Sequence, residues 1–118
     1  MLAKERLFKD LAKALQYWTE TMVEATTDPT ADLSWTEDSD PYQAIQAVLA
    51  ANKVTPEVMQ RVFAEGLRGL AVSFLTIMDG GSALSEKGRL YVVDEDGARI
   101  GEGLHDDFVS HLIAIGRL

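Results

Sequence analysis

The sequence predicts an α+β fold that is predominantly helical, with four or five helices and one C-terminal β-hairpin in a single domain over residues 1–118. Three observations indicate this class. Apolar residues recur at helical spacing over long stretches, proline twice follows a capping residue, and a short β-branched segment precedes an Asp-Gly pair. A length of 118 residues fits one domain.

Residues 4–24 are expected to form the first helix. Leu7, Leu11 and Leu15 recur at a spacing of four, and Trp18 follows on the same face. Basic residues in the first turns oppose the helix dipole, although each costs only about a few tenths of a kcal/mol when exposed. Packing of the apolar face must therefore stabilise this helix.

Residues 25–40 are expected to form a loop. Asp, Thr and Ser compete there for backbone hydrogen bonds, and Pro29 lacks an N–H. A loop of this length is uncommon in a small domain and is often functional. Its large apolar residues are Leu33 and Trp35, which we expect to anchor the loop on the core.

A short helix is expected over residues 41–52, since Asp40 is a candidate N-cap and Pro41 suits the first helical position. The same signal starts a hydrophobic stretch over residues 56–78. Two glycines interrupt that stretch and cost helix propensity. The pattern therefore leaves open whether residues 56–78 form one helix or two.

The hairpin is expected over residues 89–101. Its β-branched and aromatic start is followed by Asp96-Gly97, which is typical of a two-residue type I′ turn. This register would place Asp94 directly opposite Arg99. A last helix is then expected over about residues 106–115. The expected core of the whole fold is Leu7, Leu11, Leu15, Trp18, Ile45, Leu49, Val62, Phe63, Leu70, Phe74, Ile77, Val93, Ile100, Phe108 and Leu112.

The charge of the chain is strongly acidic and uneven. There are 11 basic and 19 acidic residues, giving a formal net charge of −8. From Ala14 to Asn52 there is no Lys or Arg, and seven acids give that segment a charge of −7. Such a surface repels phosphate backbones and anionic lipids, so neither nucleic acid nor a membrane is expected as a partner.

Residues typical of catalysis or metal binding do not form a recognisable motif. The chain has no cysteine, which excludes disulfides and cysteine-ligated metals. His105 and His111 are six positions apart, a spacing that does not bring two ligands together on a helix. No serine lies in a nucleophile-elbow context. We therefore expect no metal, no cofactor and no catalytic residues, and an enzyme ranks below a binding protein.

The acidic loop gives the first functional hypothesis. Trp35 lies close in sequence to the carboxylates of Glu37, Asp38 and Asp40. An aromatic anchor among carboxylates suits a basic protein surface, because opposite charges steer association and the ring is buried on contact. The sequence thus favours a non-enzymatic acidic protein-interaction module, one form of which is an immunity-type inhibitor. A homo-oligomer is compatible with this hypothesis.

The alternative hypothesis is a small-molecule-binding or regulatory domain. Its pocket would lie near the turn of Asp79, Gly80 and Gly81 and near the segment Gly101–His105, with His105 as a ligand-binding residue. A concave pocket with a few polar groups would favour this alternative. The expected compartment is cytoplasmic, because charges interrupt the N-terminal apolar residues and no apolar run approaches the length of a membrane span.

The C-terminal half carries a family resemblance. The stretch from Phe74 to Gly81, together with Tyr91-Val-Val-Asp94 and the segment from Gly101 to His105, resembles a group of small acidic uncharacterised bacterial proteins. The Asp-Gly-Gly turn is similar to the Asn-Gly-Gly turn of SMI1/KNR4-like immunity proteins. The chain departs from that family, since it has no upstream leucine-proline dipeptide and its N-terminal helices do not correspond. The resemblance therefore assigns no functional residue.

Overall fold

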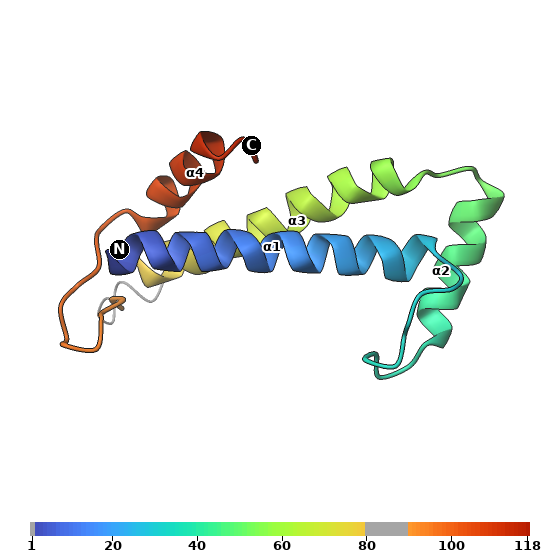
Figure 1. Ribbon diagram of the computed structural model, residues 1–118, viewed down its shortest axis with the longest axis horizontal. Helices are drawn as coiled ribbons and strands as arrows, with labels where there is room; N and C mark the ends of the chain where they lie inside the picture. The colour runs from blue at the N-terminus through green and yellow to red at the C-terminus, as the bar shows by residue number, and fades with distance from the viewer. Residues whose placement is uncertain (1, 80–89) are drawn as a thin grey trace. The chain divides into compact units, whose positions relative to one another are not determined.

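A computed structural model of the chain describes residues 2–79 and 90–118, and these residues form four helices. They are α1 (Ala3–Thr27), α2 (Asp40–Ala51), α3 (Pro56–Met78) and α4 (Leu104–Ala114) (Figure 1). The four expected helices are confirmed, with ends that differ from the predicted ends by three residues or fewer. The stretch from Pro56 to Met78 is one continuous helix.

The expected α+β class is wrong. The described residues are all-helical and contain no β-strand, and the expected hairpin is reduced to one isolated antiparallel bridge between Val93 and Arg99. Arg99 does not pair with Asp94. Its guanidinium lies 3.7 Å from the centre of the Tyr91 ring and forms an ion pair with Glu102 at 3.0 Å.

The turn between the two bridged residues also differs from the predicted type I′ turn. The backbone N–H of Asp94 donates to Ala98 O (2.8 Å) and that of Gly97 donates to Asp94 O (3.1 Å). Glu95 and Asp96 are therefore the central turn residues, and Gly97 follows at φ 81° as the third loop residue. The cause is the Asp94 carboxylate, whose Oδ1 accepts from the N–H groups of Asp96 (2.9 Å) and Ala98 (3.0 Å).

The chain divides into two compact units, one made of Met1–Ala14 and Arg68–Leu118 and the other of Leu15–Leu67. Helices α1 and α3 each contribute residues to both units. We refer to them as the terminal unit and the central unit. The expectation of one domain over residues 1–118 stays a prediction.

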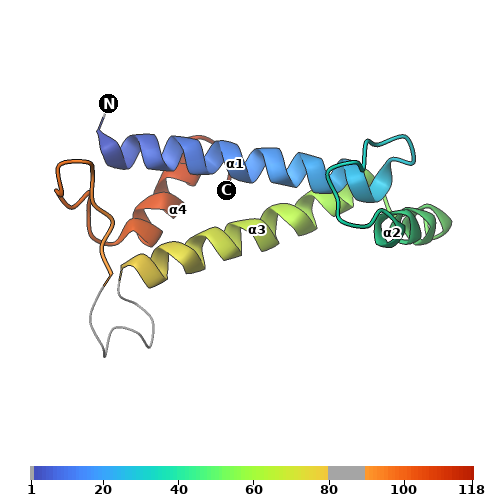
Figure 2. The same ribbon diagram turned by 90° about the horizontal axis from the view of Figure 1, so that it is seen from below.

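In the terminal unit, α4 packs its apolar face on the first turns of α1 and the last turns of α3 (Figure 2). Phe108 is fully buried, with its ring centre 5.5 Å from that of Phe8. Leu75 and Leu104 are also almost fully buried. An ion pair of 3.1 Å between Lys4 and Asp107 joins α1 to α4 at the surface. This packing positions the start of α4 beside the end of α3.

In the central unit, buried polar side chains are paired with backbone carbonyls. Gln46 on α2 is 8% exposed and donates to Ala25 O on α1 at 2.8 Å. Thr26, 5% exposed, donates its hydroxyl to Met22 O at 2.7 Å. The Thr26 hydroxyl is satisfied by the preceding turn of its own helix, and the Gln46 amide is satisfied by a carbonyl of the neighbouring helix. Both polar groups tolerate burial because they have these partners.

The expected core is largely wrong, since only Phe108 and Leu112 of the expected residues are buried. Small residues fill much of the core instead, including Ala12, Ala25 and Ala71. The face of α3 opposite its buried residues Ala71 and Leu75 is also apolar and is exposed, which is unusual for a surface helix. Among the helices of the described residues, none is long and apolar enough to cross a membrane. The expected core residues that are exposed are Trp18, Ile45, Val62, Leu70, Phe74, Ile77 and Val93.

Candidate functional site

The loop between α1 and α2 is held by its own acidic residues. Asp28 Oδ1 accepts from the backbone N–H of Thr30 (2.8 Å) and from its hydroxyl (2.7 Å). Asp32 and Asp38 each accept from the backbone N–H two residues further on, at 2.9 and 3.0 Å. Three Asx turns therefore shape the loop, so part of its acidity has a local structural role.

These hydrogen bonds also affect titration. The bond from the Thr30 hydroxyl, followed by that from its backbone N–H, lowers the pKa of Asp28 below its usual value. The bonds from Ser34 lower the pKa of Asp32 in the same way. A hydrogen bond donated to a carboxylate favours the ionised form, so both groups carry their charge well below neutral pH.

Trp35 lies in a row of four aromatic rings in the central unit. Its ring centre is 5.8 Å from that of Trp18 and 5.7 Å from that of Tyr42, both in edge-to-face geometry. Tyr17 continues the row at 5.5 Å from Trp18. Such contacts stabilise aromatic pairs beyond simple burial. The expected anchoring of the loop by Trp35 thus occurs, but on the exposed ring of Trp18 and the half-buried ring of Tyr42.

The row remains open to solvent. Trp35 is 43% exposed, Trp18 is 44% exposed and Tyr17 is 61% exposed. Glu37, Asp38 and Asp40 follow Trp35 in the chain and are all exposed. Asp40 is the first residue of α2, and the N-cap position belongs to Ser39 rather than to Asp40 as expected. We call the row of rings together with these three carboxylates the aromatic-acidic surface.

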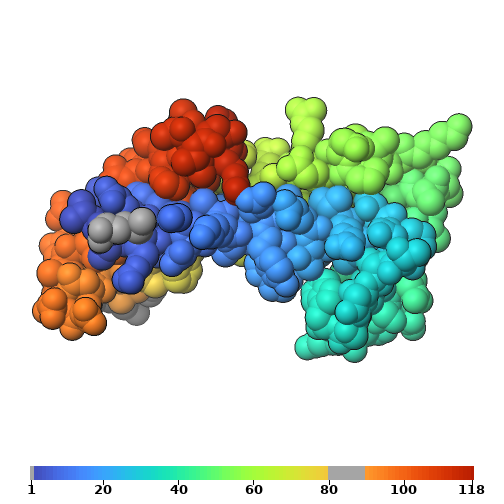
Figure 3. Space-filling view, viewed as in Figure 1, coloured from blue at the N-terminus to red at the C-terminus, as the bar shows by residue number. Residues whose placement is uncertain are grey.

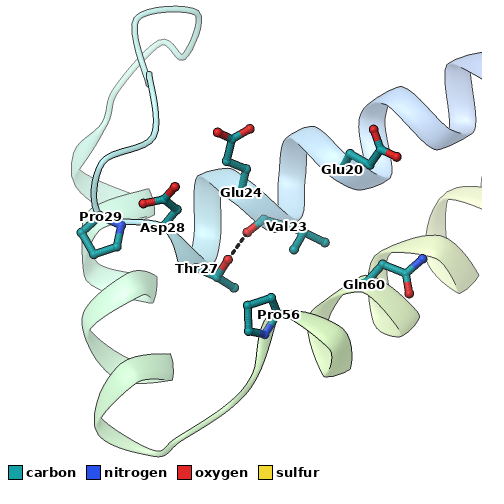
Figure 4. A pocket seen from close by; sticks show the side chains of 8 residues that line it. All are labelled: Glu20, Val23, Glu24, Thr27, Asp28, Pro29, Pro56 and Gln60. Atoms are coloured by element: carbon teal, nitrogen blue, oxygen red, sulfur yellow. Dashed lines mark hydrogen bonds between the residues drawn. The ribbon is translucent and has the colours of Figure 1, made fainter.

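A second acidic feature of the central unit is a hollow of about 580 Å³ at the end of α1 (Figure 4). Glu20, Glu24 and Asp28 contribute carboxylates at a spacing of four, which places them along one side of the helix end. Pro29 and Pro56 add apolar surface. Among the described residues, no three potential His, Asp or Glu ligands converge tightly enough to hold a metal ion.

In the terminal unit, the structure brings together two of the residues in the alternative hypothesis. Asp79 Oδ2 accepts from His105 Nδ1 (2.5 Å) and from the His105 backbone N–H (3.0 Å). The Asp79 side chain is 8% exposed and the His105 side chain 31%. Asp79, at the end of α3, therefore satisfies a free N–H in the first turn of α4. Gly80 and Gly81, named in the same hypothesis, lie outside the described residues.

The pair shifts both pKa values in directions that favour the charged forms. The hydrogen bond that the His105 ring donates to Asp79 raises the pKa of His105 above its usual value. Burial raises the pKa of Asp79, but the hydrogen bonds from His105 outweigh burial, so the pKa of Asp79 lies below its usual value. Asp106 adds a weaker attraction, with Oδ1 at 3.6 Å from His105 Nε2. The contact has the character of an ion pair.

The sequence indicated Trp35 as a candidate site residue but did not indicate its ring partners. Trp18 was expected in the core because it continues a leucine stripe, and Tyr17 and Tyr42 were not assigned to the site. Residues so far apart in sequence carry no local signal of their contact. Comparison of the chain with protein-family models, with curated proteins and with solved structures found no match.

Proposed function

We propose that the aromatic-acidic surface binds a basic protein partner and that the chain acts as a non-enzymatic interaction module. The observation that supports this most is the Trp18–Trp35 pair. Each tryptophan is more than two fifths exposed, within a segment that has seven acids and no Lys or Arg. Exposed tryptophans are common anchors of interfaces, and their ring faces attract Lys and Arg side chains.

Binding would proceed in two physical stages. At long range, the charge of −7 between Ala14 and Asn52 accelerates encounter with a cationic surface. At short range, the exposed parts of Trp18 and Trp35 lose their water, which contributes most of the affinity. The carboxylates of Glu37 and Asp38 then set orientation and association rate more than affinity. An immunity-type inhibitor of a basic toxin is one form of such a module.

Tryptophan fluorescence offers a direct assay, because the two tryptophans of the chain are Trp18 and Trp35 themselves. A candidate partner is first identified by parallel capture from the host on wild type and on Trp35→Ala. Purified partner is then titrated, and we expect a change in emission that saturates. In Trp18→Phe, Trp35 is the single emitter and should report the same affinity.

The charge contribution is tested with Glu37→Gln combined with Asp38→Asn. Asparagine retains the Asx-turn acceptor, so we expect stability to stay within about 0.5 kcal/mol of wild type. Association should slow several-fold, and its decrease between about 50 and about 300 mM salt should become shallower. Asp10→Asn with Glu95→Gln is the matched control, since it removes two exposed charges of the terminal unit.

Two results would contradict the proposal. One is a partner whose association rate responds neither to salt nor to the loss of Glu37 and Asp38 charges. The other is a partner whose affinity is unchanged in Trp35→Ala while circular dichroism shows that the variant is folded. Either outcome would place the interaction elsewhere on the chain.

A further inference from the structure

In the terminal unit, α4 and the C-terminal residues lie against the N-terminal part of α1 (Figure 3). Residues of these two segments line a basic hollow of about 550 Å³. Lys9, Lys13 and Arg117 line it together with His111, and Glu5 is the one acidic residue of the lining. Three cations and one anion give the lining a formal charge of +2 with histidine neutral. In a chain of net charge −8, this is a local reversal of sign.

The two lysines form no ion pair with any described residue, although Glu5 lies one turn before Lys9 on the same side of α1. Within residues 2–79 and 90–118, neither Lys9 nor Lys13 forms an ion pair, whereas Lys4 pairs with Asp107 at 3.1 Å. They lie four residues apart on one face of α1, where like charges repel. Glu5 compensates their positive field only in part, and an anion placed between them would relieve the repulsion.

The other two nitrogen-bearing side chains are held in place by the fold. Arg117 Nη1 donates to Ala12 O at 3.1 Å, and the Arg117 backbone N–H donates to Leu112 O at 2.8 Å. The His111 ring lies 5.8 Å from the Phe8 ring and is stacked on fully buried Phe108 at 6.4 Å. His111 makes no hydrogen bond within the described part of the chain. Fixed side chains lose little freedom on binding a ligand.

The rest of the lining is apolar. Ala12 and Ile115 contribute, and Ile115 is 47% exposed although it is a large aliphatic residue. The volume falls in the range of sites for small molecules. We propose that this hollow binds a small organic anion, whose carboxylate or phosphate lies between Lys9, Lys13 and Arg117 and whose apolar part covers Ile115. Lys and Arg side chains donate charge-assisted hydrogen bonds to such groups.

The test uses the full chain and three defined probes: hexanoate, hexyl phosphate and inorganic phosphate. Titration is followed by backbone amide NMR, and we expect saturable shifts around Ala12 and Ile115 with at least one alkyl probe. Lys9→Gln with Lys13→Gln should weaken that binding about ten-fold or more, as expected for lost hydrogen bonds to a charged ligand. Arg6→Gln with Arg61→Gln is the matched control, because it removes two exposed cations outside the lining and should leave affinity unchanged.

A second variant separates the apolar contribution from the charge. Ile115→Ala should weaken the alkyl probes several-fold and leave any binding of inorganic phosphate unchanged. Thermal unfolding of each variant without ligand verifies folding, and loss of the lysine charges should not lower the melting temperature. Equal affinity in the lysine double variant, or no saturable shift with any soluble probe, would overturn the proposal. Binding only to vesicles of anionic lipid would also overturn it and indicate a membrane surface instead.

Discussion

Asp79→Ala should destabilise the terminal unit more than any other single loss of a carboxylate. The Asp79 side chain is 8% exposed and accepts two hydrogen bonds from His105, one from the ring at 2.5 Å and one from the backbone at 3.0 Å. Hydrogen bonds to charged groups contribute about 1.5–3 kcal/mol each, and water replaces part of the ring contact because His105 is 31% exposed. We expect a total loss of about 2–3 kcal/mol, or about 10 °C in melting temperature.

The pH dependence of this loss has a defined sign. The pKa of His105 is raised in the folded state, so its contribution is fully present below the unfolded value of 6.5 and is lost as pH rises through the folded value. The pKa of Asp79 is lowered, so its contribution is present above 3.8 and is lost as pH falls through the folded value. The difference between wild type and variant should therefore be largest at about pH 5.

Urea denaturation at about pH 5 and about pH 9 measures this difference. His105→Gln separates its two parts, because the backbone N–H still donates to Asp79 while the titrating ring is gone. That variant should lose the pH-dependent part and keep the rest. Asp106→Asn serves as the control and should lose much less stability, since its side chain is 85% exposed and its Oδ1 lies 3.6 Å from His105 Nε2, too far for a hydrogen bond. A difference between wild type and Asp79→Ala that is the same at both pH values would refute the reasoning.

Three further predictions concern packing and backbone geometry. Phe108→Ala should cost about 3–5 kcal/mol in the free energy of unfolding because its ring is fully buried. Phe74→Ala should cost about 1 kcal/mol or less because Phe74 is 55% exposed. A larger cost at Phe74, measured by urea denaturation, would mean that another chain covers it. Gly66→Ala should stabilise the chain by about 0.5–1 kcal/mol, since the position is helical and an added Cβ would meet no described atom within 4 Å beyond its chain neighbours and the backbone of its own helix. A lower melting temperature would contradict this. Gly97→Val should cost about 1–2 kcal/mol because Gly97 has φ 81°, a backbone conformation that side chains rarely adopt. Gly97→Asn should cost less, because asparagine adopts this conformation more readily. Equal melting temperatures of the two variants would contradict the turn geometry.

Local signals in the sequence predicted the helices well. Thr55 followed by Pro56 predicted the start of α3, and in the structure Thr55 Oγ1 accepts from the Val58 N–H at 3.3 Å. The stripe on α1 was less informative. It indicated Leu7 and Leu11, whereas the buried residues are their neighbours Phe8 and Ala12. Alanine adds little to a hydrophobic pattern, yet its small side chain lets helices approach closely.

The features that could not be predicted depend on side chains that meet over long sequence separations or compete locally. The carboxylate of Asp94 captures two backbone N–H groups and converts an expected two-residue turn into a three-residue loop. The sequence singled out Trp35 as a candidate site residue, but its contact with Trp18 spans the end of α1 and the loop. The contact of Asp79 with His105 spans 26 residues. Periodicity does not report such pairs.

The hydrogen bond between Gln46 and the Ala25 carbonyl has a consequence for how the surface around Trp35 can change over generations. It joins α1 to α2 without using any side chain of the loop between them, so the anchor points of the loop do not depend on the loop's own sequence. Lengthening a loop is thermodynamically inexpensive, at about 0.6 kcal/mol for each doubling. Insertions and substitutions between Asp28 and Ser39 can therefore accumulate while the helices keep their packing. Under the proposed function, the surface around Trp35 can thus change with its partner while the two helices stay folded.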